Sequence, residues 1–134
     1  MVLCPCCSDI CYEDCCAPFH KGAAIPSSPV LLMRSRYSAY ALNIPKYIVK
    51  TTHRKNPSFS KDTPLWLKQI SEFSLSTRFE KLEILKAEET FQKGLVVFKA
   101  YLFQGSQNVS FQEESYFLKV QEKWFYLSGV VTKF

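Results

Sequence analysis

The chain has 134 residues, of which 47% are hydrophobic and 15% aromatic. This composition suits one modest packed domain with a small appendage and excludes a disordered chain. No apolar run approaches the ~20 residues of a membrane-spanning helix, because the longest, residues 95–98, ends at Lys99. The net charge of +5 is concentrated between residues 33 and 70. Such a basic stretch favours a solvated helical surface, with nucleic-acid or ribosome association as the alternative.

All six cysteines lie in the segment CPCCSDICYEDCC, residues 4–16. Zinc prefers four soft ligands in a tetrahedron, and a Cys-x-Cys loop followed by a turn and a returning Cys-Cys pair supplies four thiolates at one point. We therefore predict a small structural zinc module with these ligands: Cys4, Cys6, Cys15 and Cys16.

Three alternatives to this ligand set stay open. Disulfides are disfavoured because the rest of the chain has no cysteine and because the adjacent Cys15 and Cys16 cannot readily bridge each other. Cys7 is an alternative to Cys6 and would give a Cys-x-x-Cys knuckle, and His20 is a more distant candidate ligand. Reduced thiols without a signal-peptide pattern predict a cytoplasmic protein.

The order Cys-Pro-Cys, Ser8, Tyr12 and Cys15-Cys16 resembles the SEC-C motif. The same motif ends the bacterial secretion ATPase, where it binds zinc and contacts protein partners. The resemblance therefore implies a zinc ion and the docking of a protein or another macromolecule. The family pattern has glycine where this chain has Cys7 and Asp9, and glycine would permit a turn with positive φ there.

Helical patterns occupy the first half of the remaining chain. Prolines, Gly22 and serines make residues 18–28 a linker between a module at 1–17 and a main domain at 29–134. Ser28-Pro29 is typical of a helix start, Pro45 begins a second, shorter helix, and Asp62 or Thr63 caps a third.

The second half alternates with the period of strands. Leu82 and Ile84 lie on one face of a first strand, Gly94 marks a turn, and residues 95–103 form a long strand covered on both faces. Further strands follow at 111–117 and 124–127, joined by a short connection suited to a hairpin, and the last is expected to end before Gly129. Helices followed by consecutive strands indicate an α+β fold: three N-terminal helices packed on a curved antiparallel sheet, which together form a cone.

Longer runs extend the resemblance to nearly the full length. They are residues 32–41 (LMRSRYSAYA), 51–53 (TTH), 111–117 (FQEESYF) and 124–126 (WFY). These runs resemble the bacterial YchJ-like family, which joins a SEC-C motif to a nuclear-transport-factor-like (cystatin-like) cone domain. The resemblance implies the cone fold and zinc binding, and it implies no reaction.

A cone of this kind encloses a cavity between helices and sheet. Glu113 shares a strand face with phenylalanines, and Arg36 on the first helix is its expected partner. His53 could titrate near neutral pH, and Tyr40 and Trp66 could frame a pocket. One hypothesis is an isomerase- or dehydratase-like site in which Glu113 and His53 act as base and acid. The favoured one is an Arg–Glu pair that only fixes the helix to the sheet.

Overall fold

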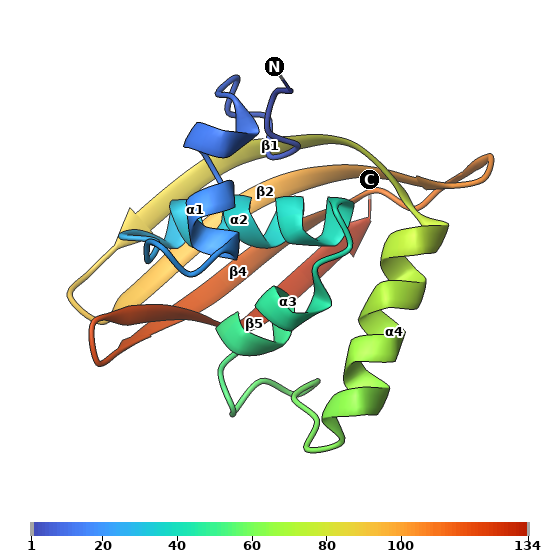
Figure 1. Cartoon of the computed structure of the whole chain (residues 1–134). Coiled ribbons are helices and arrows are strands. Elements are labelled where there is room, and N and C mark those ends of the chain that lie inside the picture. Colours follow the sequence, from blue (N-terminus) through green and yellow to red (C-terminus); the bar gives the residue numbers. More distant parts are fainter. Residues whose placement is uncertain (1, 134) are drawn as a thin grey trace.

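A curved antiparallel sheet with helices on its inner face forms the body of the molecule (Figure 1). The structure is a computed structural model that describes residues 2–133. The helices are η1 (Tyr12–Asp14), α1 (Ala17–His20), α2 (Pro29–Ala41), α3 (Pro45–Thr51) and α4 (Thr63–Ser76). The strands are β1 (Arg78–Glu89), β2 (Lys93–Gln104), β3 (Gln107–Asn108), β4 (Phe111–Val120) and β5 (Lys123–Lys133). The predicted α+β cone is therefore confirmed.

The three predicted helix starts are also confirmed, and two of them have the expected side-chain cap. The Ser28 hydroxyl accepts a hydrogen bond from the Leu31 amide at the start of α2, at 3.2 Å. The Asp62 carboxylate accepts one from the Leu65 amide at the start of α4, at 3.1 Å. Each of these side chains satisfies an amide that has no partner within its helix.

The sheet runs in the order β1-β2-β4-β5, with β3 paired to the end of β2. The hairpin between β4 and β5 turns through Gln121 and Glu122, which have φ of 49° and 67°. Two consecutive left-handed residues make the turn whose twist matches that of the flanking strands. The predicted hairpin is thus present, and it is built without glycine.

Two glycines lie within strands, where the sequence predicted a turn and a strand end. Gly94 lies inside β2 rather than in a turn, and Gly129 lies inside β5, which continues to Lys133. A Cβ atom at Gly94 would clash with the ring of Pro29 at the start of α2. At Gly129 it would clash with the Glu113 carboxylate and come within 2.7 Å of the Tyr126 hydroxyl. Both glycines therefore mark close approaches to a neighbouring element.

Two apolar clusters hold the helices in place. The larger lies between α2 and the sheet and includes Leu32, Met33, Phe98 and Phe117. The smaller joins α2, α3 and α4 through Ala39, Tyr47, Ile48, Trp66 and Ile70. Residues 18–20 of the predicted linker belong to the short helix α1, which packs on α2.

Candidate metal centre and cavity

A short hairpin at the N-terminal end brings the two cysteine pairs together. Leu3 and Cys11 form an antiparallel bridge, and the Cys4 amide donates to the Ile10 carbonyl at 2.8 Å. The turn between them needs left-handed backbone at Cys7 and Asp9, each with φ of 65°. These are the two positions at which the SEC-C pattern has glycine, so the turn keeps its shape with residues that adopt it less readily.

The sulfur atoms of Cys4, Cys6, Cys15 and Cys16 all lie within 4.8 Å of one another. Cys15 Sγ is 3.6 Å from Cys6 Sγ and 3.9 Å from Cys16 Sγ. A zinc ion with four Zn–S bonds of ~2.3 Å has sulfur–sulfur edges of about 3.8 Å, whereas a disulfide needs about 2.05 Å. The donor set and its spacing therefore fit a tetrahedral metal ion.

The other two cysteines lie apart from this cluster. All six cysteines are free. Cys7 is exposed, with its sulfur 3.4 Å from the Leu82 amide on β1, and Cys11 is half-buried at the start of η1. Cys7 thus contacts the sheet instead of taking the place of Cys6.

The four clustered thiols have unequal proton affinities. Hydrogen bonding from Cys16 is the main cause that lowers the pKa of Cys6 to about 4, with help from Ser8, Cys4 and Cys15. Burial raises the pKa of Cys4 to about 11, and the hydrogen bond to Cys6, together with burial, raises the pKa of Cys16. One thiolate surrounded by S–H donors is the arrangement expected where several thiols share a small volume.

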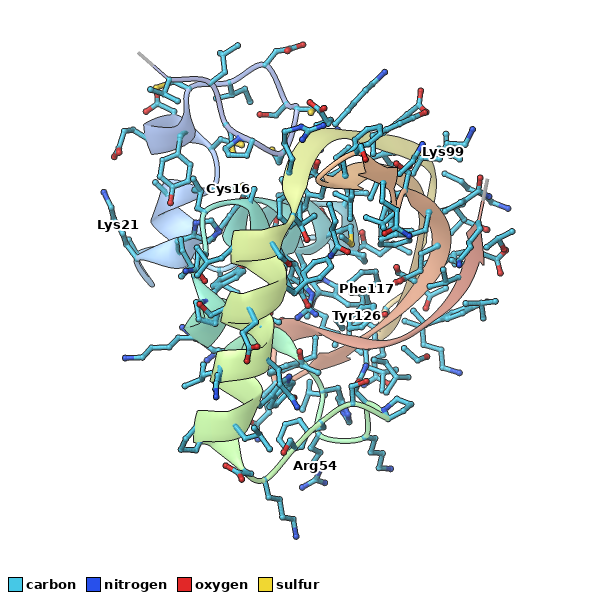
Figure 2. The ribbon with its side chains drawn as sticks, turned by 90° about the vertical axis from the view of Figure 1, so that its right-hand side faces the viewer. Cys16, Lys21, Arg54, Lys99, Phe117 and Tyr126 are labelled. Carbon is cyan, nitrogen blue, oxygen red and sulfur yellow. The ribbon has the colours of Figure 1, made fainter. Side chains whose placement is uncertain are left out.

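Two contacts attach the cysteine module, residues 2–17, to α2. The Arg34 guanidinium donates to the Cys6 carbonyl at 2.6 Å. His20 Nε2 lies 2.8 Å from the Ser35 carbonyl, and its Nδ1 lies 2.8 Å from the Tyr12 hydroxyl. Because a carbonyl only accepts, Nε2 carries the proton and Nδ1 accepts from Tyr12. His20 is therefore a bridge between module and body, and Figure 2 shows Cys16 where the two meet.

A cavity of about 420 Å³ lies between the helices and the sheet. Of the residues predicted to form a pocket, Arg36, Tyr40, Trp66 and Glu113 line it, and His53 does not. The remaining lining is mainly apolar and aromatic, from Met33, Tyr37, Ile70, Phe73, Phe79, Phe98, Ala100, Leu102 and Phe111, with Ser58, Gln69 and Tyr126 as further polar residues.

The polar end of the cavity is organised by Tyr126. Its hydroxyl donates to Glu113 Oε2 at 2.9 Å, and the Ser115 hydroxyl donates to the same oxygen. The Arg36 guanidinium lies over the Tyr126 ring, 4.6 Å from its centroid. Burial, followed by the charge of Glu113, raises the pKa of Tyr126. Figure 2 shows Tyr126 and Phe117 between the sheet and the helices.

The expected ion pair between Arg36 and Glu113 is not formed. Within residues 2–133, the four ion pairs are between other side chains, all on the surface. Arg36 Nη1 instead donates to the Ile48 carbonyl and to the hydroxyls of Thr51 and Thr52, at 2.8–3.2 Å. Tyr126 joins the two charges, a role that no sequence pattern indicated, because the alternation of residues 124–127 only places Tyr126 on the same strand face as Trp124.

His53 follows the C-cap residue of α3 and does not line the cavity. Its amide donates to the Tyr126 carbonyl at 2.8 Å, and its Nδ1 accepts from the Lys55 amide at 3.0 Å. Its ring packs edge-on against Phe125, with 6.2 Å between centroids. The fold therefore separates His53 from the cavity that Glu113 lines, and the hypothesised acid–base pair is not assembled.

Two arginines of the basic stretch are engaged within the fold. Arg36 is buried in the cavity wall and Arg34 is bonded to the module, whereas Arg54 projects from the loop after α3 (Figure 2). In the described part of the chain, no helix has both the length and the apolar character to cross a bilayer.

Comparison with known proteins supports the assignment of both parts. Residues 28–129 match the family model described as the middle NTF2-like domain of YchJ. A UPF0225 protein of Haemophilus influenzae is 42% identical over 132 residues, covering 96% of this chain and 78% of that protein. A UPF0225 protein of Sodalis glossinidius is 34% identical, covering 94% and 81%.

Solved structures of similar proteins support the same fold and the N-terminal motif. The solution structure of a SEC-C motif containing protein from Rhodopseudomonas palustris matches with a TM-score of 0.84 and 31% identity, over 97% of this chain and 98% of that one. The crystal structure of a SEC-C motif containing protein from Psychrobacter arcticus gives 0.77 and 29%, over 98% and 83%. A cystatin-like domain from Nostoc punctiforme, 11% identical over 77% and 73% with a TM-score of 0.60, supports the fold alone. The chain belongs to the YchJ-like family of UPF0225 proteins, with an NTF2-like cone and an N-terminal cysteine cluster able to hold a metal ion.

Proposed function

We propose that the chain is a zinc protein in which Cys4, Cys6, Cys15 and Cys16 hold one structural ion. The supporting observation is the spacing of their sulfur atoms, which matches the edges of a tetrahedral zinc–thiolate site. Four protein ligands leave no open position for substrate, so the ion shapes the module instead of performing chemistry. Reduced thiols as ligands suit a reducing compartment such as the cytoplasm.

The module has an apolar surface that suits docking of a protein partner. Val2, Leu3 and Ile10 lie on the two arms of its hairpin and are 76%, 61% and 48% exposed. We name these three residues the hairpin patch. Exposed apolar side chains on a small, metal-braced unit suit a protein interaction site. A nucleic-acid role has less support, because Arg34 and Arg36 are engaged within the fold.

Metal analysis tests the zinc site. We expect purified protein to contain one zinc per chain, with X-ray absorption showing four sulfur neighbours at ~2.3 Å. Cys15→Ser should lose the ion, whereas Cys11→Ser, a matched change outside the cluster, should keep it. Protein without stoichiometric zinc, or equal loss in both variants, would contradict the proposal.

Site-specific crosslinking tests the docking role. A photoreactive residue at Leu3 should yield a discrete protein adduct in cells, and Ile10→Asp should abolish it. The same probe at Phe91, which is 79% exposed in the loop between β1 and β2, is the control. Equal adducts from both positions, or adducts that survive Ile10→Asp, would show that the hairpin patch is not the docking surface.

A further inference from the structure

We propose that the cone cavity binds a small molecule with an apolar, preferably aromatic, body and an uncharged head that both donates and accepts hydrogen bonds, such as a carboxamide. The site is independent of the metal centre. Its volume of about 420 Å³ falls in the range of small-molecule pockets, and its lining has their character, an apolar wall with a few convergent polar groups.

The polar end leaves hydrogen-bonding atoms unused. All of the hydrogen bonds that Arg36 makes to residues 2–133 come from Nη1, so Nε and Nη2 have no acceptor there. Both bonds to Glu113 end on Oε2, so Oε1 has no donor within the same residues. Arg36 is 5% and Glu113 9% exposed, and the atoms without partners keep accessible surface.

Water can reach these atoms in the free protein, so a ligand that displaces this water has to supply both partners, because a polar group buried without one is costly. Arg36 offers N–H donors and Glu113 offers a carboxylate oxygen. The head group that matches this site therefore accepts a hydrogen bond from Arg36 and donates one to Glu113.

The charges at the polar end of the cavity exclude a ligand with a charged head group. The guanidinium lies over the ring of Tyr126, and the carboxylate accepts from its hydroxyl. Their charges balance, so a charged head would add a third, uncompensated charge to a buried site. A carboxylate head also cannot donate to Glu113, and an ammonium head cannot accept from Arg36.

The side chains that line the cavity indicate the kind of ligand body that fits it. Tyr40 and Phe79 each lie edge-on to Phe73, with ring centroids 5.8 and 5.9 Å apart, and all three rings line the cavity. Trp66 and Phe98 line it as well. Such walls favour a flat aromatic body, because ring pairs gain attraction beyond their buried area.

Titration of ¹⁵N-labelled full-length protein with three naphthalene probes tests the proposal by NMR. The probes share one body and differ in the head: 2-naphthamide, 2-naphthoate and 2-naphthylmethylammonium. We expect 2-naphthamide to bind about tenfold or more tightly than either charged probe, because each charged probe leaves one protein group unpaired. The shifted resonances should come from residues that line the cavity.

Variants make the test specific. Glu113→Gln removes the negative charge at nearly constant shape, so the preference should change from 2-naphthamide to 2-naphthoate. Ala100→Leu, which places a larger side chain on the cavity wall, should weaken all three probes together. His53→Ala, outside the cavity, should leave every affinity unchanged. Should Glu113→Gln fail to fold, the wild-type ranking and the Ala100→Leu result still decide the question.

Three results would overturn the proposal. They are the absence of binding by any probe, equal affinity for all three heads, and resonance shifts that lie away from the cavity and persist in Ala100→Leu. Loss of zinc would produce none of these results by itself, so this test is separate from that of the metal centre.

Discussion

Asp9 shows how one residue can serve a turn at an energetic cost. Its φ of 65° is left-handed, where a side chain other than glycine is strained by about 1–2 kcal/mol. Asp9 is exposed, so its side chain gains nothing from burial to offset the strain. The turn is nevertheless kept, because it directs Cys6 towards the returning cysteine pair.

Asp9→Gly should therefore stabilise the module. Relief of strain, reduced by the greater chain entropy of unfolded glycine, should leave a gain of about 0.5–1 kcal/mol and raise Tm by roughly 2–4 °C in thermal unfolding of zinc-loaded protein. Asp9→Ala keeps the strain and should not raise Tm. An unchanged or lower Tm for Asp9→Gly would show that the aspartate itself stabilises the turn.

The candidate site residues were only partly predictable. Helical spacing and strand alternation placed Arg36 and Glu113 on inward faces, and cysteine spacing selected the four clustered thiols. The role of Tyr126 depends on strand register, because the irregularity between Tyr116 and Phe117 sets Tyr126 opposite Phe117. No pattern within one strand encodes that register, so the sequence suggested a direct Arg–Glu pair instead.

Helix α4 forms one wall of the cavity and is less buried than α2. It packs on α2 and α3 and buries Trp66, Ile70 and Ser74, whereas most of α2 is buried. Elements with few buried contacts open locally at low free-energy cost. In Figure 1 it stands at the edge of the helical layer, away from β1 and β2 for most of its length.

Amide hydrogen exchange should show this difference between the helices. We expect weaker protection across α4 than across α2. Loss of the cap in Asp62→Ala should speed exchange in the first turn of α4 about fivefold, equivalent to about 1 kcal/mol, and leave α2 unchanged. Equal protection in both helices, or a variant effect that spreads to α2, would mean that the helical layer opens as one unit.

Helix positions were easier to predict than strand limits. Ser28-Pro29 and Asp62 carry their signals locally, in the side chains that cap the helices. Gly94 and Gly129 carry a different signal, because each leaves room for another element that is distant in the sequence. A prediction from the local sequence therefore places a turn at Gly94 and ends the last strand too early.

The cysteine module and the cone are connected at few points, so metal removal should affect them unequally. Chelation should broaden resonances of the module and shift those near Arg34, Ser35 and Leu82, which are its attachment points. The cone should still unfold cooperatively, because its two main apolar clusters contain no cysteine. Loss of all cooperative unfolding would show that the two parts fold as one.

Metal binding by the four clustered thiols should also depend on pH. Cys4 and Cys16, whose pKa values are raised, hold protons that zinc must displace, whereas Cys6, with a pKa of about 4, holds none near neutrality. Raising the pH removes these protons, so zinc affinity should increase between pH 6 and 8 by up to about 100-fold per unit. Competition with a chelator of known affinity measures this dependence, and an affinity independent of pH would contradict it.

The order of these parts along the chain determines when each can form during synthesis. The four clustered thiols lie within residues 4–16, so they can meet as soon as that short segment leaves the ribosome. The cavity needs side chains from Met33 to Tyr126, and hence nearly the whole polypeptide. The cysteine module of a nascent chain can thus form and bind a metal ion first. The strands that close the cone are still being translated at that time.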